Sequence, residues 1–392
     1  MFKDKPVIAL GIAQTLVWAS SFYIFPAMIL RLETAFGWSR IEVTGAVSLA
    51  LFLSAIASPF MGRFLDRGRG PLMMTLTAFL AALLLALVPF VETLWQFYLL
   101  SALMGTMWAG CLYDPCFALV TRARGREAKS GIVRITLMAG FASTISFPAS
   151  YYLSENFSWQ ICLWVFAAVV IFVTCPLMAW GASRMEKEER SEETSAAETV
   201  KEKAFIKLPY FWFLAFAFAC ISLLHGTTIH HFLPILSEKQ VSAEQAILLA
   251  SLIGPMQVAG RIVMVMVEKR VSNHGVALAC FVSIGFAILV LSSAGNAFLL
   301  LALSVAFFGA AYGVVSIIRP LLAREVLGGA NFGAKTGMLA LVYLVGSGSA
   351  PFLGSLIWNL GGYDLVLASM MGLAAVGLLL YWLARRSAAQ PS

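Results

Sequence analysis

The sequence predicts an all-α membrane protein of twelve transmembrane helices arranged as two six-helix bundles. Apolar residues make up 60% of the 392-residue chain, against roughly 45–50% in soluble globular proteins, which excludes a soluble fold. The apolar residues gather in stretches near the roughly 20 residues that a helix needs to cross the hydrocarbon core. One long polar segment near the middle of the chain separates two halves.

Charged or turn-rich breaks delimit the predicted helices. The helices cover residues 7–30, 41–61, 71–91, 94–120, 132–154, 159–183, 209–236, 245–267, 275–293, 297–322, 336–359 and 364–384. The first stretch is long enough to span a membrane and no small-residue cleavage site follows it, so we expect a retained helix instead of a signal peptide.

The distribution of basic residues predicts the orientation. Of the 27 Lys and Arg residues, all but Arg31, Arg40 and Lys239 fall in loops, termini and helix ends on one side of this topology. Cytoplasmic loops are enriched in Lys and Arg, so we expect both termini in the cytoplasm of a multi-pass plasma-membrane protein, located in the inner membrane if the source is a bacterium. The net charge of +7 would by itself fit nucleic acid or anionic lipid, but the distribution of the charges matters more than their sum, and we expect no nucleic-acid partner.

The polar segment from Ser183 to Lys203 has no apolar face to bury and predicts a solvated linker. We therefore expect an N-terminal bundle at 1–183, a cytoplasmic linker at 184–206 and a C-terminal bundle at 207–392. Short matches occur in the same order in both halves, which indicates two parallel repeats of the kind found in many secondary transporters. The matches are Phe25-Pro26 with Leu233-Pro234, Gly62-Arg63 with Gly260-Arg261, Asp114-Pro115 with Arg319-Pro320, and Lys129-Ser130-Gly131 with Lys335-Thr336-Gly337.

A short charged turn lies between the second and third predicted helices. It has the sequence Gly62-Arg63-Phe64-Leu65-Asp66-Arg67-Gly68-Arg69. This sequence resembles the Gly-x-x-x-Asp-Arg-x-Gly-Arg signature of the major facilitator superfamily, one residue short before the final Gly-Arg, and the helix count and repeats extend the resemblance over the whole chain. The resemblance implies that Arg63, Asp66 and Arg67 form a gating latch on the cytoplasmic side, through charge pairing and attraction of the carboxylate to a helix N-terminus.

Two other signatures of the superfamily are missing. Drug–proton antiporters carry an Arg in helix 4 four residues before a Gly, where this chain has Ser101 before Gly105. Their Gly-Pro motif in helix 5 is also absent, since residues 140–148 read Gly-Phe-Ala-Ser-Thr-Ile-Ser-Phe-Pro. The absence of both signatures argues against proton-driven drug efflux of the antiporter type.

A narrower resemblance is to the monocarboxylate-transporter-like branch. It rests on Phe36-Gly37-Trp38-Ser39-Arg40, on Trp159 and on Gly254-Pro255-Met256-Gln257-Val258-Ala259-Gly260-Arg261. Members of that branch often carry in helix 8 an Asp and, four residues on, an Arg that holds the substrate carboxylate. Arg261 matches the Arg, whereas Gln257 stands in place of the Asp. The Lys in helix 1 of some members has no counterpart here. Alternatively, Arg261 is a helix-end cation left over from the repeat of Arg63.

Asp114 and Arg319 are two of the few charged residues in the otherwise apolar helices. A charge at mid-bilayer costs at least ~2.5–3.5 kcal/mol, so such residues normally face a cavity or each other. Asp114 lies in the cytoplasmic third of its helix, and Arg319 holds the repeat-equivalent position. In the superfamily fold helices 1, 4, 7 and 10 line the central path, so we hypothesise that Asp114 and Arg319 form a gating ion pair. The alternative is that Asp114 pairs with Arg134 while Arg319 reaches headgroup-level water.

Polar stripes and three histidines supply further candidates. Tyr312, Ser316 and Arg319 share one helix face, as do Gln14, Trp18 and Ser21, and both stripes are expected to line the solute path. As an alternative, Trp18 is ordinary packing and the hydroxyls bond back to their own helix. His225, His230 and His231 lie together in one predicted helix. His231 matches Tyr23 in the repeat and is expected to contact solute or carry a proton, with a role in the helix interface as the alternative.

Nothing in the sequence predicts a cofactor or a metal site. No Cys, Asp or Glu joins the histidines at close spacing, as metal coordination would require. All six cysteines lie in apolar stretches without a CxxC motif, which is typical of small core residues. A nucleophile and base at motif spacing, a P-loop and a nucleotide-binding cassette are all missing, so we expect no enzyme.

The sequence therefore predicts a secondary active transporter that works by alternating access. The expected cargo is a small organic anion of the monocarboxylate type, with a proton as the candidate coupling ion, and the expected unit is a monomer in the lipid bilayer. Uptake is favoured over export. The predicted solute-binding residues are Arg261, Gln257, Tyr312, Trp18, Tyr23 and His231, and the predicted gating residues are Asp114, Arg319, Arg63, Asp66 and Arg67. One alternative is a carrier for a neutral hydrophobic or aromatic solute, which it would either export or take up in the manner of a vitamin carrier. The other alternative is a membrane sensor that does not transport.

Overall fold

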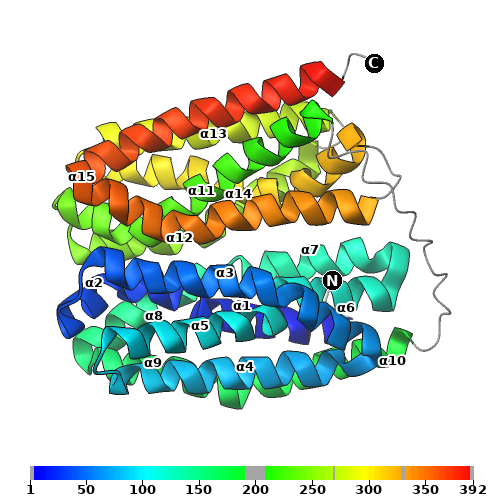
Figure 1. The fold of residues 1–392 in the computed structure, drawn as a ribbon, viewed down its shortest axis with the longest axis horizontal. Coiled ribbons are helices and arrows are strands. Elements are labelled where there is room, and N and C mark those ends of the chain that lie inside the picture. Colours follow the sequence, from blue (N-terminus) through cyan, green and yellow to red (C-terminus); the bar gives the residue numbers. More distant parts are fainter. Residues whose placement is uncertain (1–3, 190–207, 268–269, 328–331, 389–392) are drawn as a thin grey trace. The chain divides into compact units, whose positions relative to one another are not determined.

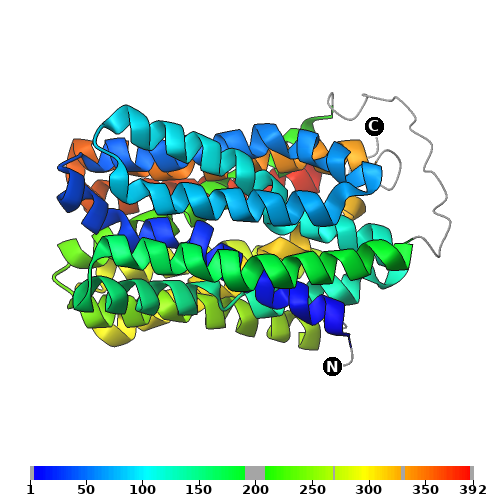
Figure 2. The same ribbon diagram turned by 90° about the horizontal axis from the view of Figure 1, so that it is seen from below.

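The computed structural model describes residues 4–189, 208–267, 270–327 and 332–388, and every regular element in these ranges is a helix. The chain divides into two compact units, Met1–Ser195 and Ala196–Ser392. Within each unit the helices run along a common direction (Figures 1 and 2). Of the predicted linker, residues 184–189 form the end of a helix, and the remainder lies outside the described residues.

The N-terminal unit is built from α-helices joined by short turns of other helix types. The α-helices are α1 (Lys5–Ser21), α2 (Ile24–Phe36), α3 (Arg40–Phe64), α4 (Gly70–Leu87), α5 (Leu94–Cys111), α6 (Tyr113–Arg124), α7 (Ala128–Ala139), α8 (Ala142–Asn156), α9 (Trp159–Val169) and α10 (Cys175–Glu189). The joining turns are η1 (Leu65–Arg69), η2 (Val88–Phe90), η3 (Gly125–Glu127) and η4 (Val170–Thr174). The C-terminal unit contains α11 (Pro209–Glu238), α12 (Ala243–Val267), α13 (Asn273–Ser293), α14 (Phe298–Leu327) and α15 (Phe332–Ala388).

Ten helical segments of the described residues are long and apolar enough to cross a membrane. Two of them, Arg40–Phe90 with 51 residues and Met338–Ser387 with 50, are more than twice as long as one crossing requires. Each contains a break in the helical backbone. Gly68 has a φ of 70° in the first segment, and Gly362 has a φ of 67° in the second. Both values lie in the left-handed region that favours glycine.

Prolines divide two of the predicted helices. The predicted helix 7–30 breaks at Phe22 and Tyr23, four and three residues before Pro26, because a proline ring conflicts with the carbonyl four residues earlier. The predicted helix 94–120 breaks at Leu112, whose ψ of −157° is extended. Pro115 has no N–H to offer the carbonyl of Cys111. These breaks place irregular backbone inside the N-terminal unit.

Small residues allow close helix contacts in both units. In the N-terminal unit, a Cβ on Gly105 of α5 would overlap the backbone of Ala50 in α3. In the C-terminal unit, a Cβ on Gly260 of α12 would overlap the backbone of Ala310 in α14. Backbones that approach this closely gain packing contacts that larger residues prevent.

Ion pairs hold the start of α1 against its neighbours. Arg124 at the end of α6 hydrogen-bonds the carboxylate of Asp4 and also lies 3.1 Å from Glu188 in α10. The hydrogen bond from Arg124 lowers the pKa of Asp4 below its usual value. The first helix is thereby tied to the two helices beside it.

We expect Gly260→Val to destabilise the protein, because the added side chain meets the backbone of Ala310, which has no room to move aside. Overpacking of this kind typically costs about 1–3 kcal/mol. The measurement is the midpoint of thermal unfolding in detergent. Gly372→Val is the matched control, since a Cβ on Gly372 meets nothing within 4 Å. Equal midpoints for the two variants would contradict the close contact.

Candidate functional site

Arg261 lies where α12 and α14 are in contact. Its side chain is only 5% exposed, and its Nε donates to the carbonyl of Gly313 in α14 at 3.1 Å. A Cβ on Gly313 would overlap the backbone of Gln257, so Gln257 lies at the same contact. Two predicted solute-binding residues, Arg261 and Gln257, are thus brought together around one glycine.

Tyr312, the neighbour of Gly313, connects this contact to two other helices. Its ring is stacked on the imidazole of His225 in α11, with centroids 3.3 Å apart and planes 5° apart. Its hydroxyl lies 2.6 Å from the hydroxyl of Tyr343 in α15. The guanidinium carbon of Arg319 lies 4.0 Å from the ring centroid of Tyr343. A continuous series of aromatic and cationic groups therefore crosses the C-terminal unit.

Among the described residues of this unit, two buried polar atoms next to Arg261 and Tyr312 stand out because they have no hydrogen-bond partner there. They are Nε2 of Gln257 and Nε2 of His225, in side chains that are 5% and 7% exposed. An unsatisfied buried polar group costs about 1–3 kcal/mol, and most such groups in native proteins are satisfied by protein, water or ligand. Both atoms are consequently candidates for contact with a small molecule.

The structure singles out His225, which was not among the predicted site residues. The repeat match with Tyr23 favours His231 instead. A second signal was present in the sequence: His225, Thr228 and Phe232 are spaced to share one face of α11. His225 also stacks against Phe308, with ring centroids 5.8 Å apart.

His231 is fully buried and has partners for both ring nitrogens. Nε2 lies 2.9 Å from the carbonyl of Pro351, and Nδ1 lies 2.9 Å from the hydroxyl of Tyr363, both in α15. A carbonyl only accepts, so Nε2 carries the proton and the hydroxyl donates to Nδ1. These contacts favour the interface role for His231, namely holding α11 against α15.

In the N-terminal unit, Gln14 repairs the proline break of the α5–α6 segment. Its Nε2 donates to the carbonyl of Cys111 at 2.9 Å, the group that Pro115 leaves without a helical donor. Trp18, one turn further along α1, packs on Tyr113 at the start of α6, with ring centroids 4.7 Å apart. Its indole Nε1 is buried without a hydrogen-bond partner among the described residues.

Other predicted residues of this unit differ in their surroundings. Tyr23 is 9% exposed and makes an edge contact with Phe147, with centroids 6.2 Å apart. Asp114 is exposed in the first turn of α6. Arg134, the alternative partner proposed for Asp114, lies 3.5 Å from Asp4. In the C-terminal unit, the hydroxyl of Ser316 donates to the carbonyl of Gly313 in its own helix. This contact corresponds to the alternative in which the hydroxyl of the polar stripe bonds back to its own helix.

The charged turn after α3 is held by its backbone. Arg122 of α6 donates to the carbonyl of Leu65 and also pairs with Glu186 of α10. Arg63 and Asp66 are exposed, as is Arg67, and the guanidinium carbon of Arg63 lies 5.4 Å from the ring centroid of Phe60. The turn thus has a fixed backbone and presents its charged side chains outward.

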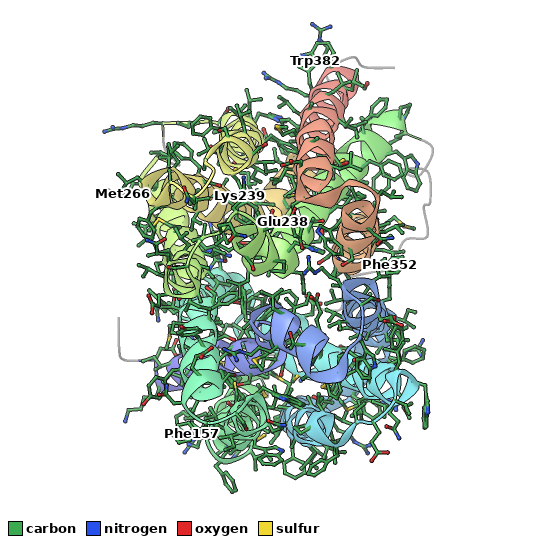
Figure 3. The ribbon with its side chains drawn as sticks, turned by 90° about the vertical axis from the view of Figure 1, so that its left-hand side faces the viewer. Phe157, Glu238, Lys239, Met266, Phe352 and Trp382 are labelled. Carbon is green, nitrogen blue, oxygen red and sulfur yellow. The ribbon has the colours of Figure 1, made fainter. Side chains whose placement is uncertain are left out.

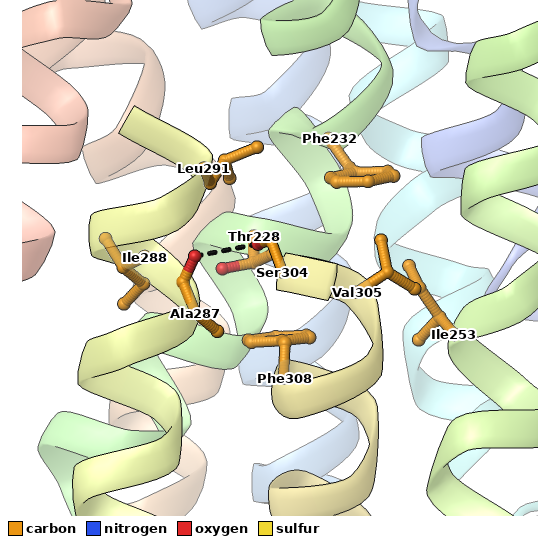
Figure 4. A pocket seen from close by; sticks show the side chains of 9 residues that line it. All are labelled: Thr228, Phe232, Ile253, Ala287, Ile288, Leu291, Ser304, Val305 and Phe308. Atoms are coloured by element: carbon orange, nitrogen blue, oxygen red, sulfur yellow. Dashed lines mark hydrogen bonds between the residues drawn. The ribbon is translucent and has the colours of Figure 1, made fainter. Parts of the chain in front are cut away.

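A small pocket lies within the C-terminal unit, between α11, α12, α13 and α14 (Figure 4). Its polar groups already have partners: Thr228 donates to the carbonyl of Leu224 at 2.8 Å, and Ser304 donates to the carbonyl of Ala287 at 2.7 Å. The other lining residues are apolar. We regard it as a packing gap next to Phe308. Among the described residues, no group of three or more His, Cys, Asp or Glu is placed to hold a metal ion.

The sequence profile described as Major Facilitator Superfamily matches residues 10–274 of the chain. This match covers more than half of the protein. The chain belongs to the major facilitator superfamily. Members of this superfamily carry small molecules across membranes, so the protein is a multi-pass membrane transporter and not an enzyme.

Similar proteins of the superfamily agree with this assignment. Multidrug resistance protein MdtG of Dickeya zeae is 33% identical over 128 residues, which are 32% of this chain and 30% of that protein. The match therefore spans less than a third of the length of that relative. The fold is similar to a variant of the nucleoside transporter NupG, with a TM-score of 0.75, 13% identity and coverage of 97% of this chain and 98% of the other. It is also similar to a bacterial homologue of the human lysosomal transporter Spinster, with a TM-score of 0.68, 15% identity and coverage of 97% and 96%.

We expect Gln14→Leu to destabilise this superfamily member by about 1–3 kcal/mol, because the buried carbonyl of Cys111 loses its donor. Thermal unfolding in detergent measures the effect. Thr75→Val serves as the control. The hydroxyl of Thr75 donates a hydrogen bond to the carbonyl of Pro71 in its own helix, so its loss breaks no contact between helices. The repair role is excluded if Gln14→Leu unfolds at the same temperature as Thr75→Val.

Proposed function

We propose that the protein is a secondary active transporter of a small organic anion, with Arg261 binding the anionic group. The observation that carries this proposal is a buried guanidinium whose position is set by the carbonyl of Gly313. A guanidinium stays charged and offers N–H pairs that match a carboxylate. Buried cations are expensive in a membrane and mark functional sites.

The neighbouring groups support a solute with a polar, planar part. Gln257 and His225 contribute buried nitrogens that have no partner among the described residues. Tyr312 and His225 contribute stacked ring faces. We assign these three residues to solute binding together with Arg261, with Trp18 and Tyr23 as aromatic contributions from the N-terminal unit, and we leave out His231 because both of its nitrogens are engaged.

The proposal extends to topology. Two bundles, at 1–183 and 207–392, flank a linker at 184–206, whose first residues 184–189 continue α10. We propose twelve crossings, since the two long apolar segments each contain a glycine break. The distribution of Lys and Arg supports cytoplasmic termini, and the bacterial source of the similar protein MdtG supports a location in a bacterial inner membrane. In this arrangement Arg63, Asp66 and Arg67 lie on the cytoplasmic side, where we assign them to the gate.

A second candidate is the transport of a neutral aromatic or hydrophobic solute. The aromatic series Phe308, His225 and Tyr312 favours it, as does the similarity over part of the chain to a multidrug resistance protein. Such a solute would use the ring faces and would not require the charge of Arg261.

Uptake into liposomes distinguishes the two candidates. We expect labelled small carboxylates to enter with the wild type and to enter at least about tenfold more slowly with Arg261→Ala, since one charged hydrogen bond is worth about 1.5–3 kcal/mol. Arg261→Lys should recover part of the rate, because it keeps the charge without the planar fork. Comparing uptake with and without an inward proton gradient measures proton coupling.

The control for this assay is Arg270→Ala, which removes an exposed cation from the same unit. Thermal unfolding of Arg261→Ala separates lost binding from lost folding. If neutral aromatics move, carboxylates do not, and Arg261→Ala has no effect, the anion proposal is wrong and the second candidate stands.

Gating by Asp114 and Arg319 has its own test. We expect Asp114→Arg and Arg319→Asp each to abolish transport in liposomes, and the double variant to recover a substantial part of it, because the charges can pair again in reversed order. Failure of the double variant to exceed either single variant would remove the proposed ion pair.

A further inference from the structure

Both units end in the same pair of side chains. Near the end of α10, the guanidinium carbon of Arg184 lies 5.8 Å from the ring centroid of Trp180. Near the end of α15, the guanidinium carbon of Arg386 lies 3.7 Å from the ring centroid of Trp382. In each pair the Arg follows the Trp by one helical turn, which places both on one face. The pairs are therefore equivalent in the two sequence repeats.

The pairs lie on the outer surface of their own units. Trp180 is 42% exposed and Trp382 is 43% exposed, and both arginines are exposed. Figure 3 shows Trp382 at the outside of the C-terminal unit. Each Trp stands where an apolar stretch gives way to charged residues. This is the position of the headgroup layer, where amphipathic indoles are enriched in membrane proteins.

The carboxylates near Arg184 form ion pairs with other arginines. Glu186 pairs with Arg122 and Glu188 pairs with Arg124, so both acids of this turn are drawn toward α6. At the end of α15 the described residues 381–387 include no acid. Within the described chain, neither Arg184 nor Arg386 makes an ion pair, and a ring face is the contact recorded for each.

We propose that each Trp–Arg pair binds the headgroup phosphate of an anionic phospholipid. A ring contact occupies the face of a guanidinium, whereas a phosphate is bound by the N–H groups in its plane, so one Arg can make both contacts. The indole also limits the motion of the Arg side chain and lies against the lipid beside it. A lipid is the occupant because an exposed indole and a cation lie together at headgroup depth.

Native mass spectrometry of the purified full-length protein tests this site. The protein is mixed with phosphatidylglycerol and phosphatidylcholine at equal concentrations, and the bound lipids are counted. We expect the wild type to retain phosphatidylglycerol in preference. A charge-assisted hydrogen bond between a guanidinium and a phosphate corresponds to at least about a tenfold gain in affinity, so the double variant Arg184→Gln and Arg386→Gln should lose the preference.

The control removes the same charge from neighbouring positions. Lys187→Gln with Arg385→Gln takes away two exposed cations that lack the recorded ring contact, and this variant should keep the preference. Trp180→Leu with Trp382→Leu keeps every charge and should weaken retention. If the control loses as much phosphatidylglycerol as the Arg184 and Arg386 variant, or if the Trp variants bind like the wild type, binding is a general effect of surface charge and the proposal is overturned.

Discussion

The structure depends on one constraint: a backbone carbonyl inside a membrane must find a donor within the protein, since lipid offers none. Helices satisfy most carbonyls, and side chains from neighbouring helices donate to several of them, including the carbonyl of Cys111 that Pro115 leaves without a helical donor. The donor and carbonyl residues are Gln14 with Cys111, Ser146 with Ala19, Ser222 with Tyr343, and Ser304 with Ala287. Each of these bonds joins two helices, so meeting the constraint also fixes which helices are neighbours.

The candidate site also contains a side chain that donates to the backbone of a neighbouring helix. Arg261 donates to the carbonyl of Gly313, and the glycine allows α12 and α14 to approach closely enough for the bond to form. The bond uses Nε and so orients the rest of the guanidinium. Tyr312 precedes Gly313 in α14, and its ring lies against the imidazole of His225. A contact that joins two closely packed helices thus also positions a cation, an amide and two rings.

Much of the fold could be predicted because its causes are local. The apolar stretches, the glycine breaks and the basic loops can be recognised within a few residues of sequence, and the signature around Asp66 pointed to the superfamily. The sequence contains Pro26 and Pro115, yet its apolar pattern predicts unbroken helices at 7–30 and 94–120, and the structure divides both. A proline is tolerated with or without a break, depending on what neighbouring helices supply.

The candidate site was less predictable because its contacts are distant in sequence. Repeat matching favoured His231, whereas the choice between His225 and His231 depends on Tyr312, Pro351 and Tyr363, which lie far along the chain. Sequence spacing shows that these histidines share a helix. It does not show which of them meets a hydroxyl and which keeps an unsatisfied nitrogen.

The six buried cysteines have a practical consequence. None of them forms a disulfide, and all are shielded from water. Thiol reagents require an accessible thiolate, so the native chain should give little background with a polar maleimide. A single cysteine introduced into an exposed loop would then report which side of the membrane that loop occupies, without first removing the natural thiols. The orientation of every loop becomes measurable in an otherwise unaltered protein.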